Sequence, residues 1–336
     1  MNEFEKTSAT PAMPLFPKVH ESKTNAAANH FMTFPVPMTC LTRLSFPAFA
    51  FLLAATSPSL SSCSHVHVGE PVVSRVTSEK PALGFTIERD LSYSPAGWPT
   101  VQVGDLYLPD SPVGSPPRPA VLLIHGGGWD APERRSDMEG IAEKLAARGY
   151  VVFNTTYRLA PAWTYPAAVE DLRQALRWLA NEAEARHLDP DRIATWGYSA
   201  GGHLAALVGL TNEANQPPVR AIVAGGAPTD LTLFPGGELV PQFIGGSLQE
   251  KPEAFRAASP VSHVDADDPP VFLYHATNDQ LVPPIHADLL YRSLANAGVP
   301  RELYWMKGRN HITGFLFEGG SEAAAIAFLD RVLSRE

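Results

Sequence analysis

Cysteine is scarce in this chain of 336 residues, which has only Cys40 and Cys63. Both lie near the N-terminal end, so the remaining residues can form neither a disulfide framework nor a metal site of cysteine ligands. Runs of lysine and arginine are also absent, and the formal net charge is −9 at pH 7. An acidic chain without a basic patch is poorly suited to hold the phosphates of a nucleic acid or of an anionic membrane surface. We therefore expect no nucleic-acid partner.

A long hydrophobic run is missing as well. The apolar stretch at residues 44–55 is shorter than the roughly 20 residues that cross a hydrocarbon core, and Pro47 interrupts it. It follows Arg43 and leads into small polar residues, which is the pattern of a removable secretory signal. We therefore predict that the protein is exported.

The end of this leader, Leu60-Ser61-Ser62-Cys63, resembles a bacterial lipobox, in which cleavage leaves the cysteine to be acylated as the new N-terminus. We predict that residues 1–63 are a leader with a lipoprotein signal. Acylated Cys63 would anchor the protein to a membrane, since two acyl chains already suffice for stable anchoring. Residues 64–82, rich in Ser, Val and Pro, are then expected to form a linker. Ordinary signal cleavage, which would leave a periplasmic or secreted protein, is the alternative.

Residues 83–336 alternate between strand-like and helix-like patterns. Two segments around a Pro-Ala-Gly-Trp-Pro turn, residues 85–92 and 101–108, predict an opening antiparallel hairpin. Further apolar runs between amphipathic helices predict strands at 120–124, 151–154, 192–196, 221–224, 271–274 and 302–305. Because such alternation implies parallel crossovers, we predict one α/β domain in which helices cover both faces of a mostly parallel sheet.

Local signals mark several helix ends and one insertion. Ser136 and Glu139 have the spacing of a capping box, and Gly149 is placed to end the helix that follows. Pro166 is suited to the first turn of the next helix. Residues 228–268 are rich in Gly and Pro and lack strand periodicity. We expect them to form a small insertion over the active-site edge of the sheet that shapes the substrate pocket.

The run Gly197-Tyr198-Ser199-Ala200-Gly201 lies between a strand-like segment and the apolar stretch at residues 202–210. A serine on a sharp turn between a strand and a helix has its hydroxyl pushed out of the sheet edge, and the flanking glycines let neighbouring backbone pass closely. On its own, the run is also compatible with a plain turn in which the serine caps a helix. We interpret Ser199 as a nucleophile because a second glycine motif accompanies it.

That second motif, His125-Gly126-Gly127-Gly128-Trp129, directly follows the predicted strand 120–124. A glycine loop of this kind supplies backbone N–H groups to an oxyanion. We predict that the N–H groups of Gly126 or Gly127 and of Ala200 form an oxyanion hole.

Together with Tyr157-Arg158-Leu159-Ala160-Pro161 and Asn278-Asp279-Gln280-Leu281-Val282-Pro283, these motifs resemble those of the α/β-hydrolase fold. Within that fold, residues 83–334 are similar to the carboxylesterases related to bacterial feruloyl and acetylxylan esterases. The related hormone-sensitive-lipase group usually has an acidic residue where this chain has Tyr198. The resemblance implies a serine carboxylesterase with a Ser-Asp-His triad.

Two aspartates that each follow a predicted strand could orient the histidine of such a triad, Asp279 and Asp230. The resemblance favours Asp279, which matches the acid position of the family, whereas Asp230 could simply cap a turn. Among the eleven histidines, His311 is the predicted general base because it alone follows the final strand. In this arrangement His311 takes the proton of the serine hydroxyl, and the carboxylate stabilises the imidazolium that forms.

Three aromatic residues, Trp129, Tyr157 and Tyr198, are close enough in sequence to these loops to line the pocket, although each could equally be packed in the core. The expected reaction, which needs no metal or organic cofactor, is hydrolysis of a small-molecule or glycan ester with a short-chain, acetyl or feruloyl group, outside the cytoplasm. An exported amidase or peptidase of the same fold is the alternative. A non-catalytic ligand-binding homologue is a weaker one, because the predicted serine, aspartate and histidine are all present.

Overall fold

The computed structural model describes residues 65–68, 82–132, 134–211, 213, 215–234, 236–317 and 320–334. The predicted leader at residues 1–63, with its signal and the lipid site at Cys63, lies outside the described residues. In the part of the chain that is described, no helix is both long enough and apolar enough to pass through a bilayer.

Nine strands of the described residues form one sheet in the order β1-β9-β8-β7-β6-β4-β5-β3-β2. They are β1 (His65–Val68), β2 (Phe85–Ser92), β3 (Val103–Pro109), β4 (Arg118–Ile124), β5 (Val151–Thr155), β6 (Leu188–Tyr198), β7 (Val219–Gly225), β8 (Val271–Ala276) and β9 (Arg301–Met306). Neighbours from β5 through β4, β6, β7 and β8 to β9 are parallel. Antiparallel pairs occur only where β1 joins β9, β3 joins β5 and β2 joins β3. The predicted mostly parallel sheet and its opening hairpin are confirmed.

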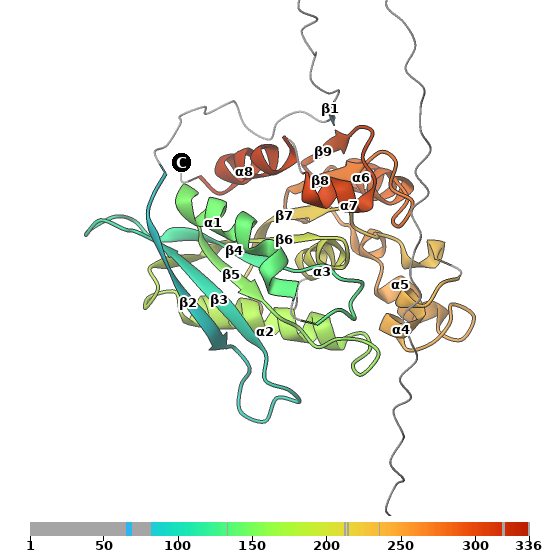
Figure 1. Ribbon diagram of the computed structural model, residues 1–336, viewed down its shortest axis with the longest axis horizontal. Helices are drawn as coiled ribbons and strands as arrows, with labels where there is room; N and C mark the ends of the chain where they lie inside the picture. Colours follow the sequence, from blue (N-terminus) through green and yellow to red (C-terminus); the bar gives the residue numbers. More distant parts are fainter. Residues whose placement is uncertain are drawn as a thin grey trace, which may run out of the picture. The chain divides into compact units, whose positions relative to one another are not determined.

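Helices cover both faces of this sheet, with α1 and α8 on one side and α2 and α3 on the other (Figure 1). The α-helices are α1 (Glu139–Arg148), α2 (Ala167–Asn181), α3 (Ala200–Leu210), α4 (Leu239–Ile244), α5 (Pro252–Ala257), α6 (Ile285–Ala297), α7 (His311–Leu316) and α8 (Ser321–Val332). The 3₁₀ helices are η1 (Arg134–Met138), η2 (Leu231–Leu233) and η3 (Pro260–His263).

Strand β4 shows how side-chain alternation serves two cores. Leu122 and Ile124 belong to the core that includes α2, α3 and α6, whereas Val121 and Leu123 belong to the core under α1 and α8. All four side chains are fully buried, which explains why this central parallel strand is apolar along its length. Full burial of a side chain of this size stabilises the fold by roughly 1.5–3 kcal/mol.

Two helix starts differ from the sequence prediction. Ser136 lies inside η1, which runs directly into α1 at Glu139, and no side-chain hydrogen bond caps α1. The predicted capping box is therefore wrong, because the 3₁₀ turn already supplies the backbone that precedes the helix. Pro166 precedes the first residue of α2 instead of lying in its first turn. Gly149 ends α1 with a left-handed φ of 103°, as predicted.

Four residues of the predicted linker form an edge strand. β1 pairs antiparallel with β9, from His65 opposite Met306 to Val68 opposite Leu303. Residues 64–82 are therefore not a free tether along their whole length, because main-chain hydrogen bonds join part of them to the sheet. This pairing could not be predicted from the sequence, since the partner strand lies near the other end of the chain.

Candidate active site

Ser199 occupies a sharp turn between the end of β6 and the start of α3. Its backbone has φ 57° and ψ −124°, a region that residues with a Cβ rarely adopt. The surrounding glycines allow this turn. A Cβ at Gly197 would lie 2.2 Å from the carbonyl carbon of Gly201, and a Cβ at Gly201 would lie 2.2 Å from the carbonyl oxygen of Ile124. The predicted arrangement of strand, turn and helix around Ser199 is therefore present.

The backbone of this turn is held by the elements on either side of it. The Ser199 N–H donates to the Gly225 carbonyl at the end of β7 (2.8 Å), and the Ser199 carbonyl accepts the His203 N–H of α3 (2.9 Å). All residues of α3 are buried, so this helix is apolar on every side and packs as part of the core. Because the backbone is held on both sides, the Ser199 hydroxyl can move mainly by rotation of its side chain.

The structure brings Ser199, Asp279 and His311 together from the ends of three elements. Nε2 of His311 lies 2.9 Å from Oγ of Ser199, and Nδ1 of His311 lies 2.6 Å from Oδ2 of Asp279. In the neutral imidazole, Nδ1–H donates to the carboxylate and Nε2 accepts from the serine hydroxyl. The three side chains therefore form a continuous path along which a proton can leave Oγ for the imidazole.

The carboxylate of Asp279, in the loop after β8, is fully buried, and its two oxygens have different hydrogen-bond partners. Oδ1 accepts the N–H groups of Leu281 (3.0 Å) and Val282 (2.8 Å), whereas Oδ2 faces His311. His275 comes within 3.5 Å of Oδ2, but its Nε2 bonds to the Val282 carbonyl at 2.8 Å. Burial lowers the pKa of His275, so this second histidine is a neutral neighbour of the carboxylate.

Asp230, the other aspartate considered as the acid of the triad, has a different role. Its Oδ1 accepts the backbone N–H (3.0 Å) and the hydroxyl (2.6 Å) of Thr232, which caps η2. Asp230 therefore caps a turn, which was the alternative considered for it on the sequence alone.

Gly126, Gly127 and Ala200 line the same cavity as Ser199. Ala200 is the first residue of α3, so its N–H has no acceptor within the helix and lies at the positive end of the helix dipole. A Cβ at Gly126 would lie 3.4 Å from Cβ of Ser199, which places the glycine loop directly beside the serine. Gly127 has a φ of 103°, a conformation that a residue with a side chain rarely adopts. The backbone of both segments is thus suited to receive an oxyanion next to Ser199.

The cavity over Ser199 has a volume of about 640 Å³. Its walls come from the glycine loop and η1, from the segment that contains η2 and α4, from the loop after β8, and from α7. Residues lining it within the predicted insertion are Pro228, Phe234, Gly236, Gly237, Glu238, Leu239 and Val240. The prediction that residues 228–268 shape the pocket is therefore confirmed for residues 228–240, and short helices provide much of the segment.

Two of the three aromatic residues considered for the pocket line it, Trp129 and Tyr198. Tyr157 does not: its ring stacks on His125 with 4.4 Å between ring centroids, and its hydroxyl donates to the His125 carbonyl at 3.0 Å. Tyr157 therefore supports the glycine loop from inside the core. The Tyr198 hydroxyl donates to the His311 carbonyl at 2.7 Å, a buried hydrogen bond between the two catalytic segments.

Other buried histidines near the site are neutral and structural. Burial lowers the pKa of both His125 and His203 to about 4. His203 accepts from the indole N–H of Trp129 at 3.2 Å and lies 2.7 Å from the Ala258 carbonyl, so both of its ring nitrogens are used. Within the described ranges, no three His, Cys, Asp or Glu side chains come together in a group that could hold a metal ion.

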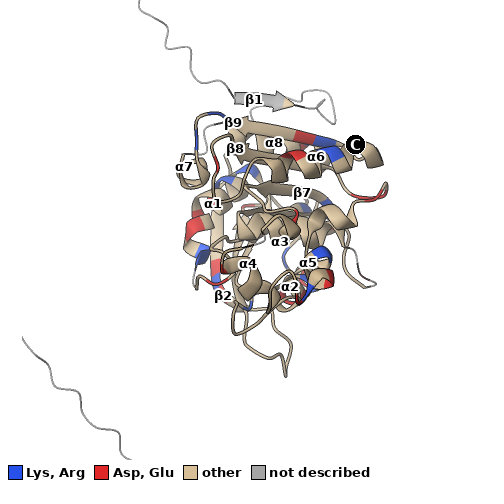
Figure 2. Cartoon of the chain, turned by 90° about the vertical axis from the view of Figure 1, so that its right-hand side faces the viewer, with Lys and Arg blue, Asp and Glu red and all other residues tan. Residues whose placement is uncertain are grey.

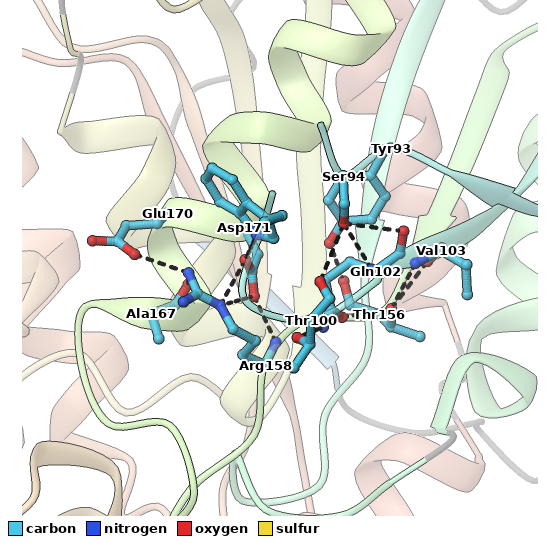
Figure 3. A network of polar contacts seen from close by, with 11 residues as sticks. Tyr93, Ser94, Thr100, Gln102, Val103, Thr156, Arg158, Ala167, Glu170 and Asp171 are labelled. Atoms are coloured by element: carbon cyan, nitrogen blue, oxygen red, sulfur yellow. Dashed lines mark hydrogen bonds and ion pairs between the residues drawn. The ribbon is translucent and has the colours of Figure 1, made fainter. Parts of the chain in front are cut away.

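A polar network that was not predicted from the sequence joins the residues after β5 to α2 (Figure 3). The buried Asp171 carboxylate accepts from the backbone N–H and Nε of Arg158 (2.7 and 2.9 Å) and from the indole N–H of Trp98 (2.6 Å). A signal was available, because Asp171 is three residues after Ala168 and four before Ala175 and therefore lies on the apolar face of α2. A charged residue on such a face indicates a buried ionic partner.

A family model described as BD-FAE matches residues 105–294, which is more than half of the chain. The chain belongs to the BD-FAE family. The matched residues include Ser199 and Asp279, whereas His311 lies beyond them. The assignment agrees with the resemblance to feruloyl and acetylxylan esterases that the sequence motifs carry.

Curated relatives of this BD-FAE protein include two esterases of Mycobacterium tuberculosis. Esterase LipC is 30% identical over 186 residues, which is 50% of this chain and 46% of LipC. Esterase LipQ is 29% identical over 203 residues, which is 55% of this chain and 48% of LipQ. The chain thus spans less than half the length of these two relatives.

Solved structures similar to the BD-FAE chain have the α/β-hydrolase fold. A truncated carbohydrate esterase from gut microbiota superposes with a TM-score of 0.68 at 22% identity, covering 76% of this chain and 99% of that one. A thermophilic esterase from Thermogutta terrifontis superposes with a TM-score of 0.62 at 24% identity, covering 77% of this chain and 95% of that one. These likenesses show the fold.

Proposed function

We propose that this BD-FAE protein is a serine carboxylic ester hydrolase that works through an acyl-enzyme. The observation that carries the proposal is the position of the His311 ring, 2.9 Å from Oγ of Ser199 and 2.6 Å from Oδ2 of Asp279. The similarity to proteins named as esterases supports the same reaction class.

In the first half of the reaction, Oγ of Ser199 attacks the ester carbonyl carbon while Nε2 of His311 takes the hydroxyl proton. Asp279 stabilises the imidazolium through Nδ1–H. The tetrahedral intermediate then collapses as His311 returns the proton to the leaving oxygen, and a neutral alcohol departs. A water molecule attacks the acyl-enzyme by the same route, which releases the carboxylic acid and restores the serine hydroxyl.

The oxyanion of each tetrahedral intermediate would be bound by N–H groups of Gly126 or Gly127 and of Ala200. These donors belong to a glycine loop and a helix start that are in place before the substrate arrives, so no reorganisation is needed. Loss of one such donor costs on the order of 3 kcal/mol of transition-state stabilisation in serine hydrolases.

For the substrate we propose a short acyl group, such as acetyl, or a feruloyl group. One structural neighbour is described as a carbohydrate esterase and another, from Caldicellulosiruptor lactoaceticus, as an acetyl ester-xyloside bifunctional hydrolase. Both names fit an ester hydrolase of this kind. We further propose that the reaction takes place outside the cytoplasm, on a protein anchored through acylated Cys63 or released after ordinary signal cleavage.

Release of p-nitrophenol from acetate, butyrate and longer acyl esters tests the proposal, with Ser199→Ala measured beside the unchanged protein. We expect the unchanged protein to hydrolyse p-nitrophenyl acetate. The Ser199→Ala variant should be slower by several orders of magnitude, since it retains only substrate binding and the oxyanion donors. Equal rates for both proteins, with both shown to be folded by circular dichroism, would remove Ser199 from the chemistry. Faster turnover of matched p-nitroanilides than of the esters would instead support the amidase alternative.

A further inference from the structure

Large apolar side chains are exposed at the mouth of the active-site cavity. Of the ten large hydrophobic side chains that are exposed within the described ranges, four line this cavity, namely Leu239, Leu281, Ile312 and Leu316. Ile312 and Leu316 are 59% and 63% exposed, and Phe317, which follows them, is 64% exposed. Exposed apolar surface beside a catalytic cavity is suited to bind an apolar group.

The cavity differs in character from one end to the other. α7 packs against β8, whereas η1 packs against β4 and β5. In the sheet, β8 and β4 lie on opposite sides of β6, whose end carries Ser199. The charged residues Asp130, Arg134 and Asp137 line the cavity from the loop after β4 and from η1, and Glu238 lines it directly before α4. The β8 end is lined instead by Leu281 and by α7, which has no Lys, Arg, Asp or Glu (Figure 2).

The proposed mechanism determines which part of the ester, acyl or alcohol, lies at the apolar end of the cavity. His311 is the first residue of α7, and its Nε2 must return a proton to the leaving oxygen. The alcohol half of the substrate is therefore next to His311 when it departs, and Ile312 is the next residue along the same helix. Arg134 and Asp137 form an ion pair (3.3 Å) at the other end of the cavity, on the side of the oxyanion loop.

We infer that α7 and Leu281 form a binding surface for an apolar alcohol, so that the enzyme prefers esters of apolar alcohols to esters of sugars. This inference rests on the proposed function and names the alcohol that it uses. A sugar at this end would turn some of its hydroxyl groups toward Ile312, Leu316 and Leu281, whose side chains cannot hydrogen-bond to them, which disfavours its binding. An alkyl chain there removes apolar surface of both partners from water.

A series of acetates of ethanol, butanol and hexanol tests the inference, with each ester kept below its solubility limit and acetate release measured. These primary alcohols are alike as leaving groups, so differences in kcat/KM report binding of the alkyl chain. We expect kcat/KM to rise on the order of tenfold from ethyl to hexyl acetate, because a buried methylene contributes up to about fourfold and this surface is half exposed. Acetylated methyl xyloside should be hydrolysed more slowly than hexyl acetate.

The variants Ile312→Gln and Leu316→Gln should flatten the alkyl series, so that kcat/KM for hexyl acetate falls toward the value for ethyl acetate in the same variant. Both side chains are exposed, so their replacement should not unfold the protein, which circular dichroism checks. Val113→Gln is the matched control, since Val113 is also an exposed apolar residue but lies in the loop before β4. The control variant should keep the rise from ethyl to hexyl acetate.

The outcomes separate this inference from the proposed function. Equal kcat/KM along the alkyl series, or a preference for the acetylated xyloside, with activity that still depends on Ser199, would overturn the apolar alcohol site and leave the esterase in place. A folded protein without activity on any of these acetates would contradict both.

Discussion

Two aspartates in this protein have equally buried carboxylates and opposite uses. The side chains of Asp171 and Asp279 are both 0% exposed, and each accepts at least three hydrogen bonds. Asp171 pairs with the guanidinium of Arg158, which stays protonated in proteins. Asp279 pairs with the imidazole of His311, which the proposed mechanism uses as the group that takes and returns a proton.

The comparison shows that the partner, and not the burial, decides what a buried carboxylate does. Burial raises the pKa of Asp171, and the hydrogen bonds from Arg158 oppose that shift. The result is a fixed charge pair that ties the residues after β5 to α2. The carboxylate of Asp279 instead orients the imidazole of His311, which moves a proton in the proposed reaction.

The largest effect on catalysis is expected from Asp279→Asn. The amide keeps the volume of the side chain but cannot stabilise the imidazolium, and it favours the wrong tautomer of His311. We expect kcat/KM for p-nitrophenyl acetate to fall by about 10⁴-fold, with a small change in the free energy of unfolding. A loss of less than tenfold in a folded variant would show that Asp279 is not the triad acid.

Asp171→Asn should give the opposite profile. It leaves the buried Arg158 guanidinium without its main carboxylate partner, which costs roughly 3–5 kcal/mol of stability for a buried pair. Urea unfolding measures this loss, and kcat of the molecules that remain folded should stay within a few-fold of the original. If kcat fell as far as in Asp279→Asn at unchanged stability, the division of roles between the two aspartates would be wrong.

Two histidines extend the comparison, because His203 is as buried as His311 but has no carboxylate partner. Burial lowers the pKa of His203 to about 4, whereas in the unfolded chain it is about 6.5. The unfolded state therefore binds a proton first, and stability that is complete above pH 6.5 is lost as the pH falls toward 4, by about 3 kcal/mol for this one group.

Unfolding by urea at pH 7 and pH 4.5 measures this dependence. His203→Gln should lose less stability than the original protein between these two pH values, since glutamine can keep both hydrogen bonds without titrating. His187→Gln, at an exposed histidine, is the control for the substitution itself. Equal pH dependence in all three proteins would show that His203 does not contribute.

The smallest effect is expected at Tyr198, whose hydroxyl donates to the His311 carbonyl at 2.7 Å. Tyr198→Phe removes one buried hydrogen bond, about 1 kcal/mol, which should lower kcat roughly fivefold without raising KM. Tyr93→Phe removes a similar bond, to the Thr156 carbonyl at 2.6 Å, away from the triad. That control should leave kcat unchanged, and equal changes in both variants would indicate a general loss of stability instead.

The sequence predicted those parts of the site that short motifs encode. Ser199 lies in a turn whose glycines are fixed by close backbone contacts, and its run together with the glycine motif at residues 125–129 was enough to identify it. Asp279 and His311 each follow a strand of a parallel sheet, and the ends of such strands converge at one edge. The α/β fold itself was predictable because helix and strand periodicities alternate regularly along the chain.

The parts that could not be predicted depend on contacts between distant segments. The hydrogen bond from Tyr198 to His311 joins residues 113 positions apart. The helices α4 and α5 have six residues each, too few to be stable alone, so packing decides whether they form. The failed capping box at Ser136 has a similar cause, because a 3₁₀ turn that no local rule favoured replaced the expected cap.

The pairing of β1 with β9 also bears on how far the catalytic domain could reach from an anchor at Cys63. A free linker of residues 64–82 could extend roughly 60 Å, whereas the two residues from Cys63 to His65 span about 7 Å. That distance is close to the depth of a lipid headgroup layer. In a chain acylated at Cys63, this short connection would hold the β1 edge of the sheet at the bilayer surface. The enzyme would then bind its ester substrates close to the membrane.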